Sequence, residues 1–282
     1  MNITPRTKLI GLIGHPVEHS LSPQLHNALY REYGLDYIYV AFDIAPGDVA
    51  QAAAAFRTLS FVGFNVTIPH KQSIIPFLDA LEYEARAIGS VNTVRIQDGK
   101  LFGYNTDGMG FVDSLKRRGI ELGGKRVLVL GAGGSARAIC VYLLKERIDG
   151  LYILNRTRGR AVELINSLAS FFPAAYLHCI DNEDLEGLKP DLIINTTPLG
   201  MWPDVESDPL ESYDFSPGTI VVDIIYNPPE TLFLRRAREA GCVTVNGLDM
   251  LIGQALKAIE IWTGVVMDYD RAVDLVIKNK KG

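Results

Sequence analysis

Short apolar runs alternate with amphipathic stretches along the first third of the chain. Apolar runs bounded by polar and turn residues are typical of strands, whereas apolar positions three and four residues apart are typical of helices. The expected strands are residues 9–13, 37–44, 61–68, 91–96 and 101–104, and the expected helices are residues 23–33, 48–59 and 74–81. The last two strands flank an Asp-Gly pair, which predicts a hairpin. The alternation as a whole predicts a sheet with mostly parallel strands.

A second alternating block follows a connecting helix at residues 108–118. Its expected strands are residues 127–131, 151–154, 192–195, 220–224 and 243–246, and its expected helices are residues 135–147, 158–171 and 230–240. This order is typical of a doubly wound, Rossmann-like sheet. Two further helices are expected at residues 250–262 and 270–278, and we expect them to pack back on the first block.

The predicted fold class is therefore α/β, with two three-layer α/β domains and a cleft between them. The first domain, with a mostly parallel sheet, comprises residues 1–107 and is completed by residues 248–282. The second domain, residues 108–247, is Rossmann-like. Because ligands of open α/β sheets bind outside the carboxyl ends of the strands, we expect the functional residues there.

A glycine-rich turn connects the first strand of the second domain to its helix. The sequence from Arg126 to Ala136 is R-V-L-V-L-G-A-G-G-S-A, so that Gly131, Gly133 and Ala136 form the pattern G-x-G-x-x-A. Gly131 permits the turn, and Gly133 lets backbone N–H groups approach a pyrophosphate at the positive end of the helix. The strand-turn-helix context predicts a dinucleotide cofactor, with an ordinary tight turn as the alternative.

Cations follow the next strand, where an NAD site usually has an acidic residue. The segment reads Asn155-Arg156-Thr157-Arg158-Gly159-Arg160 and opens the helix at residues 158–171. Positive charge at a helix N-terminus is unfavourable by about 0.3–1 kcal/mol per charge. A 2′-phosphate held by guanidinium groups would offset this cost. The segment therefore predicts NADP rather than NAD, with a solvated helix face as the alternative.

Composition excludes several function classes. The 282 residues carry a net charge of −5 without a long basic run, which argues against a nucleic-acid partner. No apolar stretch reaches about 18 residues, so we expect no membrane partner. We see no signal or transit peptide, and expect a cytoplasmic protein. The scattered Cys140, Cys179 and Cys242 predict reduced thiols, and the five histidines give no metal signature, so we expect no metal.

Polar residues gather beside glycine or proline at the strand ends of the first domain. The segments are G-H-P-V-E-H-S-L-S-P from Gly14, N-V-T-I-P-H-K from Asn65, G-S-V-N-T from Gly89 and Y-N-T-D from Tyr104. Since strand ends are where open α/β sheets bind ligands, we expect these segments to meet in one pocket.

With these motifs the chain resembles the shikimate dehydrogenase family. The segments that carry the resemblance cover essentially the whole chain in the family's order: H-S-L-S-P, N-V-T-I-P-H-K, G-S-V-N-T, G-Y-N-T-D, G-A-G-G-S-A, N-R-T and N-G-L-D-M-L-I-G-Q. The resemblance implies NADP-dependent, reversible reduction of 3-dehydroshikimate to shikimate in the pathway to chorismate and the aromatic amino acids. It also implies that the first domain binds the substrate and the second binds NADP.

The resemblance further implies roles for individual residues. Lys71 matches the family's catalytic lysine and Asp107 its partner, and both contact the substrate. The other substrate-binding positions are Ser20 and Ser22 for the carboxylate, Thr67, Asn92 and Gln254 for the ring hydroxyls, and Tyr226 nearby. The cofactor-binding positions are Gly131, Ala132, Gly133, Gly134, Ser135, Asn155, Arg156, Thr157, Arg158, Gly159, Arg160, Ile224 and Gly247.

These residue types fit the chemistry of a ketone reduction. An ammonium held on the carbonyl oxygen can stabilise negative charge and supply a proton, as Lys71 would do, with Asp107 orienting it. Simpler interpretations stay open at this point. Lys71 could be a solvated surface lysine. Asp107 could cap the helix that follows it, and Ser22 could cap a helix that has Pro23 at its first position. Asn92 could be a turn residue that bonds its own backbone.

Two alternatives to a strict shikimate dehydrogenase stay open as well. One is a bifunctional quinate/shikimate dehydrogenase, and the other is a non-catalytic NADP-sensing module. A sensing module needs the glycine turn but not Lys71, Asp107 and the polar pocket, so their joint presence favours the enzyme. We expect a monomer or a homodimer.

Overall fold

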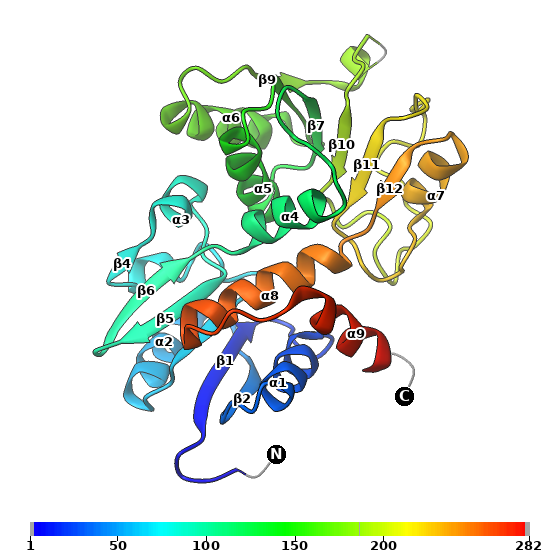
Figure 1. The fold of residues 1–282 in the computed structure, drawn as a ribbon. Coiled ribbons are helices and arrows are strands. Elements are labelled where there is room, and N and C mark those ends of the chain that lie inside the picture. The colour runs from blue at the N-terminus through cyan, green and yellow to red at the C-terminus, as the bar shows by residue number, and fades with distance from the viewer. Residues whose placement is uncertain (1–2, 186, 280–282) are drawn as a thin grey trace. The chain divides into compact units, whose positions relative to one another are not determined.

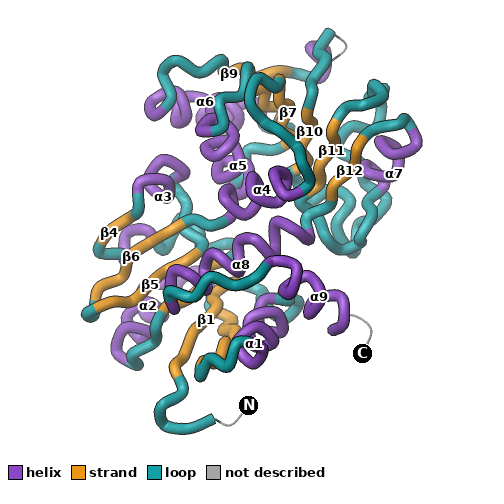
Figure 2. Tube along the Cα trace, viewed as in Figure 1, coloured by secondary structure: helices purple, strands orange, loops and turns teal. Residues whose placement is uncertain are grey.

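The computed structural model describes residues 3–185 and 187–279. These described residues divide into two compact units. The first unit contains the chain up to Gly110 together with the segment from Ile252 onward, and the second unit contains Phe111–Leu251. Each unit is built around a sheet rich in parallel strands, with helices beside it (Figures 1 and 2). The α/β fold class is therefore as predicted, whereas the binding roles of the two units stay predictions.

The sheet of the first unit has the strand order β2-β1-β3-β5-β6-β4. Strand β1 runs parallel to β2 and β3, β4 runs parallel to β6, and β5 runs antiparallel to both β3 and β6. Asp98 and Gly99, both with positive φ, form the predicted hairpin turn between β5 and β6. The bounds are β1 (Lys8–Gly14), β2 (Tyr37–Asp43), β3 (Gly63–Val66), β4 (Ala80–Leu81), β5 (Thr93–Gln97) and β6 (Lys100–Tyr104).

Helices cover both faces of this sheet. Successive residues of a strand point to opposite faces, so two neighbouring residues of β3 identify the helix on each face. Phe64 of β3 packs against Phe56 of α2 (Val49–Thr58), with 4.9 Å between the ring centroids. Gly63, the preceding residue, lies under Trp262 of α8 (Leu248–Thr263), and a Cβ at Gly63 would lie 2.3 Å from the indole nitrogen. That nitrogen donates to the Val94 carbonyl at 2.9 Å. The end of the chain therefore completes the first unit.

Helix α1 (Ser22–Glu32) joins α8 on that face, since the ring of His26 lies 5.8 Å from that of Trp262. Helix α9 (Tyr269–Asn279) docks on α1 through an ion pair between Arg271 and Glu32. The Asp268 backbone N–H also donates to Tyr33 Oη at 2.7 Å. Both C-terminal helices thus pack on the first block of the chain, as the sequence predicts.

The sheet of the second unit has the strand order β12-β11-β10-β7-β8-β9, and every pair in it is parallel. The chain order reverses between β7 and β10, and such a switch point is where open α/β sheets bind ligands. The strands are β7 (Arg126–Leu130), β8 (Gly150–Leu154), β9 (Leu177–Ile180), β10 (Leu192–Asn195), β11 (Ile220–Asp223) and β12 (Val243–Val245). The helices are α5 (Gly134–Lys145), α6 (Arg158–Phe171) and α7 (Leu232–Glu239), together with α4 (Asp107–Arg117), which begins in the first unit and ends in the second.

The sequence-based prediction of a helix at residues 74–81 is wrong. Pro76 lacks an N–H donor and cannot continue a helix, so the segment forms a short 3₁₀ turn at Ile75–Phe77 and then the edge strand β4. The sequence also did not predict α3 (Tyr83–Ile88) or β9, which are short. Helix α3 starts at a carboxylate cap, because Glu82 accepts the backbone N–H groups of Glu84 and Ala85.

No helix among the described residues is both long enough and apolar enough to cross a bilayer.

Candidate active site

The Lys71 ammonium and the Asp107 carboxylate lie together in the first unit. Lys71 Nζ donates to Asp107 Oδ2 at 2.5 Å, and the two side chains are 18 % and 9 % exposed. Lys71 belongs to the turn that follows β3, and its carbonyl accepts the Val91 N–H at 2.8 Å. The interpretation of Lys71 as a solvated surface lysine is therefore wrong.

Asn92 holds the second oxygen of Asp107. Its Nδ2 donates to Asp107 Oδ1 at 2.7 Å and to Thr106 Oγ1 at 3.0 Å, while its Oδ1 accepts the Thr106 N–H at 2.8 Å. Asn92 is buried and bonds across the fold rather than to its own backbone. Asp107 is thus held from two sides, by a cation and by an amide.

The capping roles considered for Asp107 and Ser22 are wrong. Helix α4 begins at Asp107, whose backbone N–H donates to Asn105 Oδ1 at 3.1 Å, so its carboxylate is directed at Lys71 instead. Helix α1 begins at Ser22, with Leu21 as its N-cap and no capping side chain. Ser20 Oγ accepts the Ser22 N–H at 3.3 Å. The Ser22 hydroxyl is therefore not consumed by helix capping.

The polar segments of the first unit meet where its strands end, at one end of the sheet. Strand register pairs Ile13 with Val66, Asn65 with Thr93, and Thr93 with Tyr104. A Cβ at Gly14 would lie 2.3 Å from Thr67 Cγ2, so this glycine permits close approach of the turn after β3. The segments that carry Ser20, Ser22, Thr67, Lys71, Asn92 and Asp107 therefore lie next to one another at that end of the sheet.

Gln254 and Tyr226 come from other parts of the chain. Gln254 is half-buried on α8, in the segment that belongs to the first unit. Tyr226 is half-buried in the second unit, just after β11, and burial raises the pKa of its phenol.

Tyr39 is a buried polar residue that the sequence analysis missed. Its Oη donates to Asn65 Oδ1 at 2.7 Å, and Asn65 Nδ2 donates to the Asn92 carbonyl at 2.9 Å and to Thr93 Oγ1 at 3.0 Å. The signal in the sequence is Asn65 itself, a polar residue between Phe64 and Val66 of a buried strand, because a buried amide needs partners.

The glycine turn of the second unit follows β7 and faces the loop after β10. Gly131 has φ +105°, and a Cβ there would lie 2.6 Å from Thr196 Oγ1. Gly133 is the N-cap of α5 without a capping side chain, and a Cβ there would meet nothing within 4 Å. The first N–H groups of α5 thus have no capping side chain and follow a residue with open space beside it, which fits a pyrophosphate.

The cationic segment after β8 starts α6, as predicted. Asn155 Nδ2 donates to the Thr157 carbonyl at 2.8 Å and closes the turn before the helix. The Arg158 guanidinium forms an ion pair with Asp181. Arg156 and Arg160 are exposed and form no ion pair with another described residue. Their guanidinium groups are therefore better suited than that of Arg158 to bind a 2′-phosphate.

Ile224 and Gly247 lie in contact within the second unit. A Cβ at Gly247 would lie 1.9 Å from the Ile224 carbonyl oxygen, so only glycine permits this approach. The turn that carries Ile224 and Tyr226 is held by Asp223, which is fully buried and accepts the Ile225 N–H at 3.0 Å and the Thr231 hydroxyl at 2.8 Å. Asp223 also accepts from Asn195 Nδ2 at 3.1 Å.

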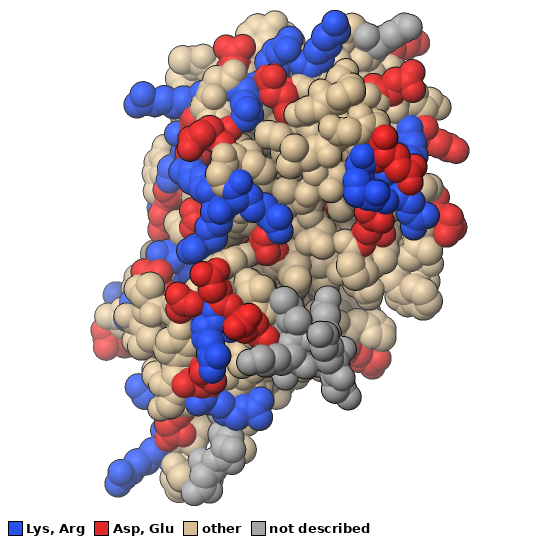
Figure 3. Space-filling view, turned by 45° about the vertical axis from the view of Figure 1, so that its right-hand side comes forward, with Lys and Arg blue, Asp and Glu red and all other residues tan. Residues whose placement is uncertain are grey.

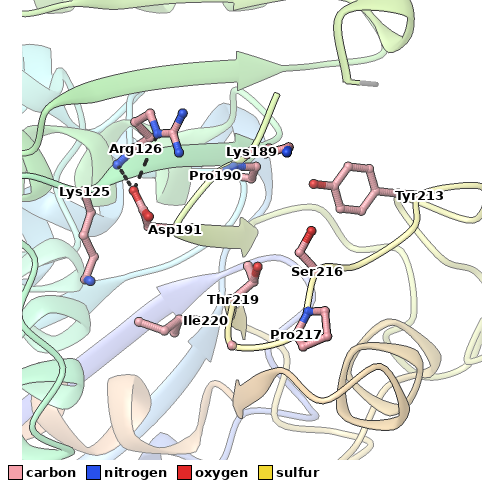
Figure 4. A pocket seen from close by; sticks show the side chains of 11 residues that line it. Lys125, Arg126, Lys189, Pro190, Asp191, Tyr213, Ser216, Pro217, Thr219 and Ile220 are labelled. Carbon is pink, nitrogen blue, oxygen red and sulfur yellow. Dashed lines mark hydrogen bonds and ion pairs between the residues drawn. The ribbon is translucent and has the colours of Figure 1, made fainter. Parts of the chain in front are cut away.

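A surface pocket of about 340 Å³ lies at the amino ends of β7, β10 and β11, opposite the glycine turn (Figure 4). Arg126 and Asp191 form an ion pair on its wall, and Lys125 and Lys189 also line it. Ligands of open α/β sheets bind at the carboxyl ends of the strands, so this pocket is not the candidate site. In the described part of the chain, no group of three or more His, Cys, Asp or Glu residues is placed to hold a metal ion.

Positive and negative side chains are interspersed on the face of the molecule shown in Figure 3. Acidic side chains lie beside many of the basic ones drawn there, in keeping with the small net charge of the chain. The functional charges are thus local ones, such as Lys71 and the arginines at the start of α6.

Protein-family models match most of the chain. The shikimate dehydrogenase substrate binding domain matches residues 12–94, and the shikimate / quinate 5-dehydrogenase family matches residues 114–185. The shikimate 5'-dehydrogenase C-terminal domain matches residues 247–276. The matches cover both units and contain most of the candidate site residues.

Curated proteins and solved structures agree with these matches. The shikimate dehydrogenase (NADP(+)) of Moorella thermoacetica is 47 % identical over 94 % of this chain and 90 % of its own. A crystal structure of shikimate 5-dehydrogenase from Listeria monocytogenes in complex with shikimate and NAD has a TM-score of 0.92 at 37 % identity, and covers 98 % of both chains. The Thermus thermophilus enzyme in complex with NADP(H) and shikimate has a TM-score of 0.87 at 34 % identity, and covers 96 % of this chain and 99 % of its own.

Proposed function

Because the chain belongs to the shikimate dehydrogenase family, we propose that its site carries out the family's reaction through Lys71 and Asp107. The reaction is the reversible, NADP-dependent reduction of 3-dehydroshikimate to shikimate. The protein is thus an oxidoreductase of the shikimate pathway. The observation that carries the residue assignment is the 2.5 Å contact between Lys71 Nζ and Asp107 Oδ2.

Lys71 acts on the carbonyl oxygen of the substrate. One of its three N–H bonds is donated to Asp107, which leaves two for the oxygen. During reduction this ammonium stabilises the developing alkoxide and donates a proton to it, and during oxidation the amine accepts the proton from the hydroxyl. Asp107 orients Lys71, and Asn92 holds Asp107 in place.

The remaining polar residues bind the substrate. Ser20 and Ser22, at the start of α1, supply hydroxyl donors to the carboxylate, where the first N–H groups of the helix add favourable partial charge. Thr67, Gln254 and Tyr226 bind or border the ring hydroxyls, and Asn92, whose amide hydrogens are held by Asp107 and Thr106, borders them. This arrangement holds the ring at both ends, so that the carbonyl is presented to Lys71 in one orientation.

The cofactor, when bound, would supply the hydride for reduction in its reduced form, NADPH, and would accept it for oxidation in its oxidised form, NADP+. The open N-terminus of α5 behind Gly133 binds its pyrophosphate, with Gly131, Ala132, Gly134 and Ser135 shaping the turn. The segment from Asn155 to Arg160 binds the adenosine phosphate, and Ile224 and Gly247 border the nicotinamide. The free guanidinium groups of Arg156 and Arg160 favour NADP over NAD.

Replacing Lys71 tests the assignment. We expect Lys71→Ala to lower kcat for shikimate oxidation with NADP by about 100- to 10,000-fold, the usual contribution of a general acid–base group. The control is Lys116→Ala, which removes a lysine paired with Glu146 in the second unit and should leave kcat unchanged. The assay follows absorbance at the reduced-nicotinamide band, with shikimate and quinate each tested against NADP and NAD. A Lys71→Ala loss below about tenfold contradicts the role.

The cellular location and the assembly are also proposals. We infer a cytoplasmic enzyme, since its substrate and cofactor are small molecules and the described residues contain no membrane-spanning helix. We infer a monomer or a homodimer, and sedimentation of the purified protein distinguishes the two.

A further inference from the structure

The Asn105 side chain joins two segments of the first unit that carry site residues. Asn105 is 4 % exposed, its Nδ2 donates to the Ser90 carbonyl at 2.9 Å, and its Oδ1 accepts the Asp107 N–H at 3.1 Å. Both partners are backbone groups with fixed roles, because a carbonyl only accepts and an N–H only donates. The amide of Asn105 therefore has one orientation, and it holds the turn before β5 against the start of α4.

The bond to the Asp107 N–H fixes the backbone from which the carboxylate projects. Asp107 is the first residue of α4, so its N–H has no partner within the helix. Asn105 accepts this N–H from two residues upstream, as in an Asx turn. The side chain that starts from this backbone reaches Lys71 Nζ at 2.5 Å and Asn92 Nδ2 at 2.7 Å.

The bond to Ser90 closes a ring of contacts that passes through Lys71. Val91, the residue after Ser90, donates its N–H to the Lys71 carbonyl at 2.8 Å. Lys71 Nζ donates to Asp107 Oδ2, and the Asp107 N–H donates to Asn105. The ring thus holds Lys71 at both its backbone and its ammonium, and the Asn105 amide links these two points.

We propose that Asn105 is a positioning residue, whose amide places the Asp107 carboxylate so that the Lys71 ammonium points at the substrate carbonyl. This inference rests on the proposed function. A lysine ammonium sits on a flexible four-carbon side chain, so its remaining N–H bonds keep one direction only while the carboxylate holds it. Since Asn105 acts through the backbone of Asp107, its loss lowers kcat by a larger factor than it raises KM for shikimate.

Two replacements of nearly equal size isolate the bond to Asp107. Asn105→Ala and Asn105→Ser both lose the amide that donates to Ser90, but a serine hydroxyl can still accept the N–H two residues on. We expect Asn105→Ala to lower kcat for shikimate oxidation about tenfold or more, with KM for NADP within about twofold. Asn105→Ser should have a kcat at least about threefold above that of Asn105→Ala, although both variants melt at lower temperature than the wild type.

Asn27→Ala is the matched control. Asn27 also bridges two backbone groups of the first unit, because its Nδ2 donates to the Tyr39 carbonyl at 2.8 Å and its Oδ1 accepts the Tyr39 N–H at 2.9 Å. The control therefore loses the same pair of bonds at a place outside the ring. We expect its kcat to stay within about twofold of the wild-type value, although its melting temperature falls too.

Several results would overturn the proposal. A kcat for Asn105→Ala within about twofold of wild type would remove the role, and equal kcat values for the alanine and serine variants would make the amide merely structural. An equal fall in kcat for Asn27→Ala would trace the effect to lost stability. If Asn105→Ala does not fold, Asn105→Ser must still lower kcat by a larger factor than it raises KM for shikimate. A wild-type protein without shikimate turnover would refute the proposed function itself, whereas normal wild-type turnover with an unaffected Asn105→Ala refutes this inference alone.

Discussion

Single buried polar residues at the strand ends of both units are each held by several partners. Asn92 uses its whole amide on Thr106, Asp107 and neighbouring groups, and Asp223 accepts from Ile225, Thr231 and Asn195. A buried group with several partners has one stable orientation, and it passes that orientation to the residue it contacts. At the scale of residues, the site thus depends on groups that need not touch the substrate.

The free energy of unfolding should depend on pH through Asp223, and Asp223→Asn should remove that dependence. Burial raises the pKa of Asp223 to about 6, so between pH 4 and pH 6 the folded protein binds a proton that the unfolded chain has released. The free energy of unfolding therefore falls as the pH rises through this range, by up to about 3 kcal/mol. We expect Asp223→Asn to remove this fall, although it lowers stability at pH 4 because Thr231 loses its acceptor.

Urea unfolding of both proteins at several pH values measures the difference. Asp181→Asn is the control, because Asp181 is exposed and pairs with Arg158 at the surface. A stability difference between wild type and Asp223→Asn that does not change from about pH 4 to pH 7 would contradict the prediction.

At the scale of elements, two helices of the second unit start without a capping side chain. These are α5, which starts after Gly133, and α6, which starts after Thr157. Uncapped N–H groups and adjacent arginines favour bound anions. The sequence predicted both helix starts, because the glycine pattern and the cations are local signals. The pairing of Arg158 with Asp181 could not be predicted, since Asp181 follows a strand that the sequence does not reveal.

The arginines at the start of α6 should contribute unequally to NADP binding. We expect Arg156→Ala and Arg160→Ala each to raise KM for NADP about tenfold or more, because each removes a charge-assisted bond to the 2′-phosphate. KM for NAD should stay within about twofold. Arg158→Ala is the matched control and should have the smaller effect on NADP, because Asp181 already engages that guanidinium. Steady-state kinetics with both cofactors measure this, and equal effects on NADP and NAD would refute the phosphate clamp.

At the scale of the whole molecule, the sequence predicted most strands and helices and the return of the chain end to the first block. Periodicity and glycine turns act over a few residues, and they were sufficient for this. The contact between Tyr39 and Asn65 was not predictable, because it joins side chains 26 residues apart that meet only when β1 lies between their strands. Lys71 and Asp107 were assigned through the family resemblance, and the structure adds that they are in contact.

Truncation of the chain after Leu251 should abolish the function of the first unit and keep NADP binding by the second. The truncated chain lacks Trp262, which covers Gly63 and bonds the Val94 carbonyl, and it lacks α9. The second unit keeps all its strands. We expect such a chain to bind NADP with a Kd within about threefold of the full chain, but to lose shikimate turnover and the cooperative melting of the first unit, because a large apolar face is uncovered. Loss of NADP binding in this chain would contradict the prediction.

The insertion of Phe111–Leu251 into the first unit sets the order of events on the ribosome. Synthesis runs from the N-terminus at about 5–20 residues per second, so the second unit is complete before most of α8 and all of α9 exist. Until those helices emerge, one face of β1, β3 and β5 stays uncovered, and chaperones and neighbouring chains can bind to it. The part of the protein that is translated first is thus the last to mature.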